Sequence, residues 1–341
     1  MITGTRSVSE SPLWRRRLRQ AFTSLPELLE FLDLEARDLP RALRATEDFR
    51  LRVPRELAER MEKGDPRDPI LLQVLPRGVE REAAEGFTTD PLREERSSPV
   101  PGLIRKYRGR ALWIVSGACA VHCRYCFRRH FPYPEHQRWS EGWDEVLEHL
   151  EADGSLREVI LSGGDPLSVA DGRLAALVER LGRIVHLKTL RIHTRWPVVV
   201  PSRVTDDLLR WVRATRLRTV FVVHANHPRE IDESAEEALG DLRSAGPLVL
   251  NQSVLLRGVN DAPEILEELS RRLFDAGALP YYLHLLDPVA GAAHFRVPAT
   301  EARRIVGEMA ARLPGYLVPR LVREAPGEEA KRVLGVRSVS R

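Results

Sequence analysis

Three cysteines, the only ones in the 341-residue chain, stand in one short stretch as Cys119-Ala-Val-His-Cys123-Arg-Tyr-Cys126. They follow the apolar run 111–115, so the pattern predicts a tight loop at the end of a strand. Three thiolates on one loop can bind three irons of a 4Fe-4S cluster and leave the fourth iron open for chemistry. A zinc site completed by His122 or His130 is the alternative, although structural zinc sites usually have four ligands from two C-x2-C pairs. A disulfide fits less well, because the cysteines are odd in number and closely spaced.

Lysine is rare in this chain. Of its 53 basic residues, only Lys63, Lys106, Lys188 and Lys331 are lysine, and the others are arginine. A primary amine can form a Schiff base with an aldehyde, which a guanidinium cannot do. Lys331 follows a Pro-Gly loop that could carry it back over the mouth of a barrel. Taken from the residues alone, a solvated lysine in the tail is the commoner interpretation.

From about residue 108 the chain alternates short β-branched runs with amphipathic helical stretches. Strands are expected at 111–115, 158–162, 189–193, 219–224, 248–254, 281–285 and 316–322, with helices near 143–151, 174–183, 206–214, 234–244, 262–276 and 301–312. Such units predict an α/β fold with parallel strands and right-handed crossovers, arranged as a partial (β/α) TIM-like barrel. The expected organisation is an N-terminal helical and irregular extension (1–100), the barrel (101–315), and a last strand with a C-terminal segment (316–341).

Polar clusters follow several of these strands, where the active site of such a fold is built. Ser162-Gly163-Gly164-Asp165 ends the second strand; the glycines allow close approach to a ligand, and the carboxylate can accept from an ammonium or a ribose hydroxyl. By itself this is more often only a strand-to-helix turn. His224 and His227 could suggest a metal pair, but neutral histidines that bind backbone or ligand are the commoner case, and we assign them to a cofactor pocket. Gln252 lies on the fifth strand and is assigned to the same pocket.

Composition narrows the class of protein. Hydrophobic residues make up 43% of the chain, and no apolar stretch has the length of a membrane span or signal peptide. The chain has three clustered cysteines and no others, which fits a reducing compartment. A cytoplasmic protein is therefore expected. The net charge of +4 is small and dispersed, which argues against direct nucleic-acid binding.

Ordered motifs then give a more specific resemblance. The cysteine spacing, with Tyr125 before the third cysteine, resembles the radical S-adenosylmethionine (radical SAM) superfamily, and residues 100–331 resemble its lysine 2,3-aminomutase family. The matching segments are Phe-Arg-Arg at 127–129, Leu-Ser-Gly-Gly-Asp at 161–165, Arg-x-Pro-Val-Val at 195–199, His-x-Asn-His-Pro at 224–228, Asn-Gln-Ser-Val-Leu-Leu-Arg-Gly-Val-Asn at 251–260, Pro-Tyr-Tyr-Leu at 280–283 and Ala-Pro-Gly-Glu-Glu-Ala-Lys at 325–331.

The resemblance implies three cofactors, which are a 4Fe-4S cluster on the cysteines, S-adenosyl-L-methionine and pyridoxal 5′-phosphate. It makes Lys331 the lysine that carries pyridoxal phosphate, and this replaces the tail interpretation. It also implies that Arg128 binds the substrate carboxylate, and that Arg110 and Tyr107 contact pyridoxal phosphate. The Ser162–Asp165 turn would hold the methionine amino group.

Selectivity for a substrate with a distal ammonium needs acidic groups at the far end of the pocket. Asp287 matches one such aspartate of the family. Glu324 stands where the family has a second aspartate, whose side chain is one methylene shorter than that of glutamate. The resemblance therefore implies L-lysine as the substrate.

The chain stops ten residues after Lys331 and has no further cysteine, whereas the free-lysine enzymes continue and carry zinc-binding cysteines. Residues 287–295 and 317–324 resemble the short branch that makes (R)-β-lysine for a ligase, which attaches it to translation elongation factor P. An electron donor such as flavodoxin or ferredoxin is implied too. A stand-alone aminomutase for osmolyte or antibiotic metabolism is the alternative enzyme, and an iron–sulfur electron carrier without turnover is the alternative from another class.

Overall fold

The computed structural model describes residues 12–35, 47, 49–136 and 143–335. Parts of the predicted extension (1–11, 36–46 and 48) and the end of the predicted C-terminal segment (336–341) lie outside the described residues. The strands described are β1 (Leu103–Ile104), β2 (Arg110–Ser116), β3 (Glu158–Gly163), β4 (Thr189–Thr194), β5 (Arg218–Val223), β6 (Leu248–Leu255), β7 (Leu279–Leu285), β8 (Arg320–Arg323) and β9 (Arg332–Val333).

The helices are short before β2 and longer after it. The α-helices are α1 (Leu13–Arg19), α2 (Leu25–Phe31), α4 (Arg55–Ala58), α5 (Pro69–Leu72), α6 (Tyr133–His136), α7 (Trp143–Ala152), α8 (Asp171–Arg183), α9 (Trp196–Val199), α10 (Asp206–Ala214), α11 (Glu233–Ser244), α12 (Pro263–Asp275) and α13 (Ala299–Arg312). The 3₁₀ turns are η2 (Gly78–Arg81), η3 (Glu94–Ser97), η4 (Pro166–Ser168), η5 (Pro201–Arg203), η6 (Pro228–Glu230), η7 (Ala293–Phe295) and η8 (Gly315–Leu317).

One sheet carries all these strands in chain order, from β1 to β9. Within β2 to β8, all neighbouring strands are parallel. At the two ends of this set, β1 pairs antiparallel with β2, and β9 pairs antiparallel with β8. The two edge strands of the parallel set therefore pair with short antiparallel strands and not with each other, which makes the barrel partial. The predicted fold class is confirmed.

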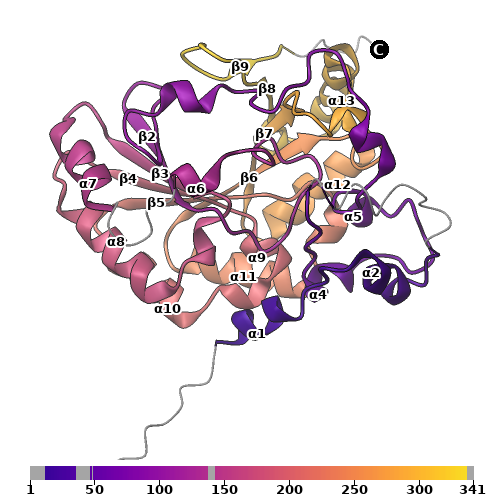
Figure 1. Cartoon of the computed structure of the whole chain (residues 1–341), viewed down its shortest axis with the longest axis horizontal. Coiled ribbons are helices and arrows are strands. Elements are labelled where there is room, and N and C mark those ends of the chain that lie inside the picture. Colours follow the sequence, from indigo (N-terminus) through magenta and orange to yellow (C-terminus); the bar gives the residue numbers. More distant parts are fainter. Residues whose placement is uncertain (1–11, 36–46, 48, 137–142, 336–341) are drawn as a thin grey trace, which may run out of the picture.

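Hydrophobic patterning explains the layers. In β5, the successive residues Phe221, Val222 and Val223 are all fully buried, as expected for a strand of a parallel sheet covered on both faces. In α8, Leu174, Leu177 and Val178 recur at helical spacing and are buried against the sheet. Figure 1 shows α7, α8, α10, α11, α12 and α13 following one another around the outside of the curved sheet.

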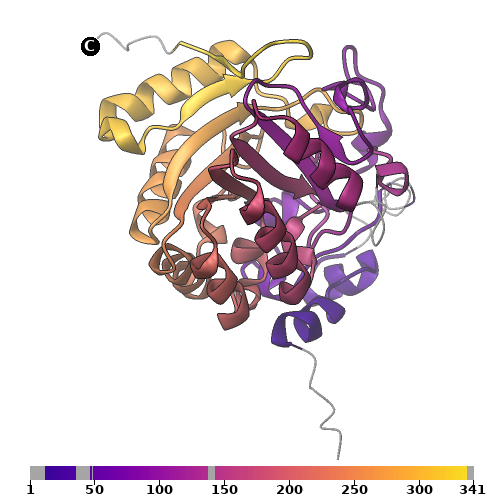
Figure 2. The same ribbon diagram turned by 90° about the vertical axis from the view of Figure 1, so that its left-hand side faces the viewer.

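The N-terminal elements share the core of the barrel. Trp14 of α1 packs edge-on against Trp196 of α9, with ring centroids 5.2 Å apart, and Arg203 lies over the Trp14 ring. In Figure 2 the N-terminal helices lie at the lower right, and α13 and the C-terminal strands lie at the upper left. None of the helices described is long and apolar enough to cross a bilayer.

The prediction of a strand over 316–322 is partly wrong. Residues Gly315–Leu317 form the 3₁₀ turn η8, and β8 begins only at Arg320. Pro319 has no N–H to donate to the sheet, so pairing can start only after it.

Candidate active site

The cysteine loop follows β2 and is anchored by backbone hydrogen bonds to the N-terminal extension. The backbone N–H of His122 donates to the carbonyl of Arg52 at 3.0 Å, and that of Arg124 donates to the carbonyl of Gln73 at 2.8 Å. These bonds fix the loop between the extension and the sheet.

The three thiols lie close enough to influence one another. Burial, with smaller contributions from Cys126 and Cys123, raises the pKa of Cys119 well above its ordinary value. Burial and Cys123 raise the pKa of Cys126 to about 11. Thiols gathered in this way fit a site where metal binding displaces their protons.

Among the described residues, no group of three or more His, Cys, Asp or Glu side chains is placed to hold a single metal ion. A 4Fe-4S cluster does not require that convergence, because each thiolate binds a different iron. The cysteine set therefore fits a cluster with one iron free of protein ligands.

The Gly-Gly-Asp turn at the end of β3 packs directly on the start of this loop. Gly163 has a φ of +124°, and a Cβ atom there would lie 2.2 Å from the carbonyl oxygen of Ser116. A Cβ on Gly164 would lie 2.7 Å from the carbonyl oxygen of Ala118. The two glycines are thus needed for close approach to the protein backbone itself, whereas the sequence suggested approach to a ligand.

Asp165 is buried and bonded to protein donors. Its Oδ1 accepts from the N–H of Leu167 at 3.0 Å and the hydroxyl of Thr194 at 2.8 Å, and its Oδ2 accepts from the N–H of Arg195 at 2.6 Å. Burial raises its pKa to about 7 despite these bonds. Asp165 thus joins β3 to the end of β4, and its contact with S-adenosylmethionine stays a prediction.

Arg128 is held by a glutamate that the sequence did not single out. Its Nε and Nη2 donate to the two carboxylate oxygens of Glu94 at 2.6 and 2.9 Å, and its Nη1 donates to the Ser162 hydroxyl at 3.0 Å. Glu94 is 3% exposed and also pairs with Lys106, at 3.0 Å. This places Arg128 and Lys106 on one buried carboxylate, with Ser162 bonded to Arg128.

Lys106 connects Glu94 to the C-terminal segment. Its Nζ lies 3.1 Å from Oε1 of Glu324, and Oε2 of Glu324 bonds the amine of Lys331. Burial favours the neutral acid, but Lys331 and Lys106 hold the pKa of Glu324 well below its ordinary value. Five alternating charges, from Arg128 through Glu94, Lys106 and Glu324 to Lys331, therefore connect residues far apart in the sequence.

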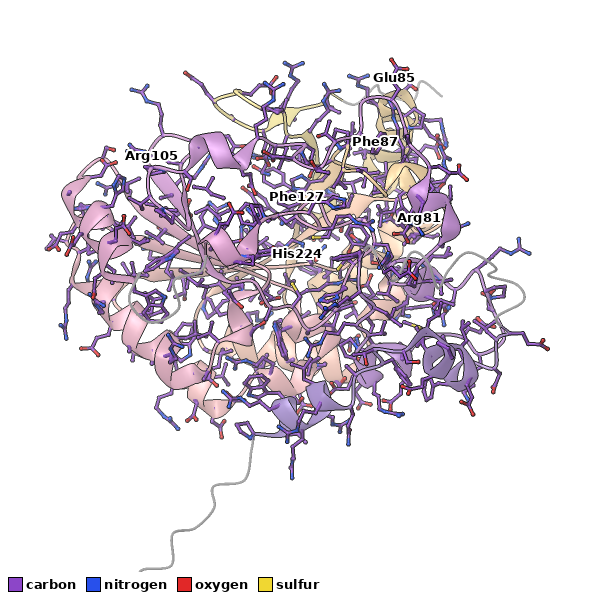
Figure 3. All side chains as sticks on the ribbon, viewed as in Figure 1. Arg81, Glu85, Phe87, Arg105, Phe127 and His224 are labelled. Carbon is purple, nitrogen blue, oxygen red and sulfur yellow. The ribbon has the colours of Figure 1, made fainter. Side chains whose placement is uncertain are left out.

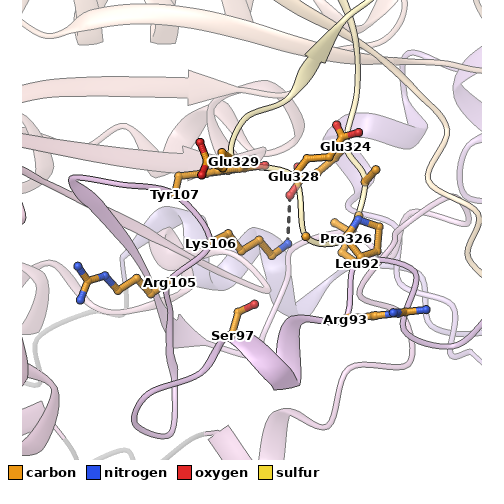
Figure 4. Close-up of a pocket in the computed structure, with 12 residues that line it drawn as sticks. Leu92, Arg93, Ser97, Arg105, Lys106, Tyr107, Glu324, Pro326, Glu328 and Glu329 are labelled. Carbon is orange, nitrogen blue, oxygen red and sulfur yellow. Dashed lines mark hydrogen bonds and ion pairs between the residues drawn. The ribbon is translucent and has the colours of Figure 1, made fainter.

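A cavity of about 350 Å³ adjoins this connection, between residues 92–107 and the loop 324–329 (Figure 4). Lys106 and Glu324 line it, and their contact is drawn there as a dashed line. Tyr107 lines it too and stacks under the guanidinium of Arg110, 4.7 Å from the ring centroid. Burial and Glu324 raise the pKa of Tyr107. The structure thus brings the two predicted pyridoxal phosphate contacts together, with Tyr107 next to Glu324.

Asp287 belongs to the same electrostatic group. Burial, with the charge of Glu324 next, raises its pKa to about 7, while Lys331 and Lys106 act in the opposite direction. Two acids and two amines are therefore close enough here to influence one another's protonation.

Buried histidines line the neighbouring interior. His224 lies toward the middle of the molecule (Figure 3), and its Nε2 is 3.0 Å from the amide nitrogen of Gln252. Burial lowers the pKa of His224 to about 3, so the ring is neutral. His193 and His284 each have a buried Nε2 with no hydrogen-bond partner among the described residues, and Lys331 contributes to the lowered pKa of both. Unpaired buried nitrogens near the Lys331 amine fit a pocket that receives a polar cofactor.

His227 is separate from this group. Its Nδ1 accepts from the N–H of Arg229 and caps η6. Of the two histidines, only His224 has Lys331 and Arg128 among the charges that act on its pKa, so only His224 is placed with the candidate site.

Sequence analysis missed Glu94, Lys106 and the buried pair Arg195–Glu230. Glu94 lies in the N-terminal extension, where the sequence analysis named no site residue. A rare lysine at position 106 was a signal, but nothing marked Glu94, because its burial depends on the fold.

Comparison with known proteins agrees with the geometry. Residues 113–269 match the model of the radical SAM superfamily. A protein of Haemophilus influenzae named L-lysine 2,3-aminomutase is 47% identical over 95% of this chain and 96% of that protein. Its namesake from Escherichia coli strain K12 is 50% identical over 93% of each chain. A longer namesake from Clostridium subterminale is 33% identical, and the match spans 76% of its length.

The chain belongs to the L-lysine 2,3-aminomutase family of radical SAM enzymes. Members are isomerases. Membership implies a 4Fe-4S cluster, S-adenosylmethionine and pyridoxal phosphate, and the cysteine loop and the surroundings of Lys331 fit these groups.

Proposed function

We propose that this enzyme converts L-α-lysine to (R)-β-lysine. The observation that carries the proposal is the charge arrangement near Lys331, in which Glu324 and Asp287 lie beside the amine and Arg128 is connected to it through Glu94, Lys106 and Glu324. An amino acid with a cationic side chain needs a cation for its carboxylate and acids for its distal ammonium. The family name of the relatives supports the same substrate.

Arg128 is proposed to bind the substrate carboxylate. Its guanidinium is fixed by Glu94 on one side and by Ser162 on the other, so the cation is oriented before substrate arrives. Preorganised donors lower the entropic cost of binding a carboxylate in one pose.

Glu324 and Asp287 are proposed to receive the distal ammonium. In the structure Glu324 binds the ammonium of Lys331, and this contact supports a role in binding an ammonium. If Lys331 carried pyridoxal phosphate, Glu324 would be left to accept from the distal ammonium of the substrate. The two acids then fix the length of side chain that fits.

Lys331 is proposed to carry pyridoxal phosphate, with Arg110 and Tyr107 as contacts. Bound pyridoxal phosphate supplies a π-system through which nitrogen can migrate to the neighbouring carbon, and bound S-adenosylmethionine at a reduced cluster supplies the radical that starts the shift. The residues of this chain hold the substrate at both ends, and the apolar and neutral histidine walls keep water from the radical site.

The test is an anaerobic turnover assay. The cluster is reconstituted, pyridoxal phosphate, S-adenosylmethionine, dithionite and L-lysine are added, and β-lysine is measured by chiral chromatography. We expect (R)-β-lysine from the wild type and none from Lys331→Ala. Cleavage of S-adenosylmethionine without any β-lysine would keep the radical chemistry but refute lysine as the substrate.

We further propose that the product serves the modification of elongation factor P in the cytoplasm, with a flavodoxin or ferredoxin as electron donor. The resemblance of residues 287–295 and 317–324 to the short branch supports this, as does the nearly full-length match to relatives of similar length. Incubating the reconstituted and reduced enzyme, with its cofactors, lysine, the ligase and elongation factor P, should add one lysyl mass to that protein, and much less should be added when the enzyme is left out. A ligase that accepts no product of this enzyme would favour a stand-alone metabolic role.

A further inference from the structure

Arg195 reaches from the end of β4 to the cysteine loop. Its Nη1 donates to Sγ of Cys123 at 2.7 Å, and its guanidinium lies 5.8 Å from the ring centroid of Tyr125. The residue is 7% exposed, and its backbone N–H is fixed by Asp165. A buried cation therefore contacts one of the three cluster cysteines.

Glu230 balances this cation from the opposite side. Its Oε2 accepts from Nη2 of Arg195 at 2.7 Å, and the residue is fully buried. Its Oε1 accepts from the Gln73 amide at 3.0 Å and from the N–H groups of Asn226 and His227 at 2.9 and 3.0 Å. The carboxylate is thus rigidly placed behind the arginine, and no described residue separates the two.

The charges near an iron–sulfur cluster and the hydrogen bonds to its sulfurs set its reduction potential. A cation that donates to a ligand thiolate stabilises the reduced cluster, which carries one more electron. An acid behind that cation offsets part of the effect, and both act strongly because the surroundings are buried and of low dielectric.

We propose that Arg195 is a positioning residue that raises the reduction potential of the cluster through Cys123, and that Glu230 limits this increase. The inference rests on the proposed ligation by the cysteines and not on the substrate. It makes the pair a determinant of how readily an electron donor can start the reaction.

The test is a redox titration of the reconstituted full-length enzyme, followed by the electron paramagnetic resonance of the reduced cluster. Arg195→Gln should lower the ratio of reduced to oxidised cluster at a fixed potential about tenfold, which equals about 59 mV for one electron. Glu230→Gln should shift the ratio in the opposite direction, because the arginine remains and loses its counter-charge. The double variant should lie between the two.

Arg203→Gln is the matched control, since Arg203 is also fully buried and paired with an acid, Asp171, but donates to backbone carbonyls and not to a cysteine. It should leave the potential unchanged. Shifts of the same sign in Arg195→Gln and Glu230→Gln, or shifts no larger than in the control, would overturn the inference.

If Arg195→Gln does not retain iron, Glu230→Gln decides alone. A higher reduction potential of the cluster in this variant supports the inference, and an unchanged potential refutes it. Failure of the wild type to bind a cluster at all would instead refute the cysteine assignment. Absence of lysine turnover, with the potentials shifted as stated, would refute only the proposed substrate.

Discussion

Replacing Asp287 by asparagine should stabilise the protein at high pH. The Asp287 carboxyl is buried beside Glu324, and its pKa is raised from 3.8 to about 7. A folded state that raises the pKa of an acid binds the proton more tightly than the unfolded chain does. Stability is therefore lost as the pH rises from the unfolded pKa to the folded one, and the loss is complete above about 7.

The magnitude follows from the two pKa values. Each tenfold difference in proton affinity corresponds to about 1.4 kcal/mol, so the whole interval amounts to about 4 kcal/mol of unfolding free energy. About 3 kcal/mol of this falls between pH 5 and pH 8, because the unfolded carboxyl is already ionised at pH 5. A neutral asparagine of similar shape does not lose this free energy.

The assay is urea unfolding of wild type and Asp287→Asn without pyridoxal phosphate or lysine, at pH 5 and pH 8. The stability difference between the two proteins should grow by about 3 kcal/mol in favour of the variant at pH 8. Asp275→Asn, at an exposed site on α12, is the matched control and should show no such change. A difference that is the same at both pH values would refute the electrostatic account of Asp287.

Further perturbations test the other parts of the site. Glu94→Gln should raise the Michaelis constant for lysine about tenfold, equal to about 1.4 kcal/mol, because Arg128 loses one of its fixing bonds; Glu80→Gln, at another buried acid paired with an arginine, should not, and equal effects would contradict the positioning role. Lys331→Ala should lose the absorbance of bound pyridoxal phosphate and all β-amino acid formation while still cleaving S-adenosylmethionine; product formation by this variant would refute its assignment. Gly163→Ala should lower the free energy of unfolding by about 3 kcal/mol or more, whereas Gly182→Ala, in open space on α8, should gain up to about 1 kcal/mol, and a harmless Gly163→Ala in urea unfolding would contradict the close packing on Ser116.

Much of the fold could be predicted because local patterns and the architecture agree. The strand-helix alternation after residue 108 gave the parallel strands, since β-branched runs and amphipathic stretches have different periods. The antiparallel β9 could not be predicted in the same way, because tertiary contacts decide so short an element. The last strand was predicted to begin too early, because Pro319 prevents pairing before Arg320.

The site was predictable where a motif fixes chemistry and not where burial does. The cysteine loop and Lys331 carry residue types that few positions require, so their spacing is informative. Glu94 and Glu230 are ordinary acids in the sequence, and only the fold buries them against Arg128 and Arg195. Gly163 was singled out, but for a ligand and not for the backbone it meets.

The most direct test of the account is turnover of L-lysine that carries deuterium on its β-carbon. The proposed chemistry would move the nitrogen from the α- to the β-carbon. Hydrogen would leave the β-carbon for the 5′-carbon of bound S-adenosylmethionine and would return to the α-carbon. We predict β-lysine with deuterium on its α-carbon and S-adenosylmethionine that has gained deuterium at the 5′-carbon, both detectable by mass spectrometry. β-Lysine formed without any deuterium in S-adenosylmethionine would contradict a shared radical and pyridoxal phosphate site.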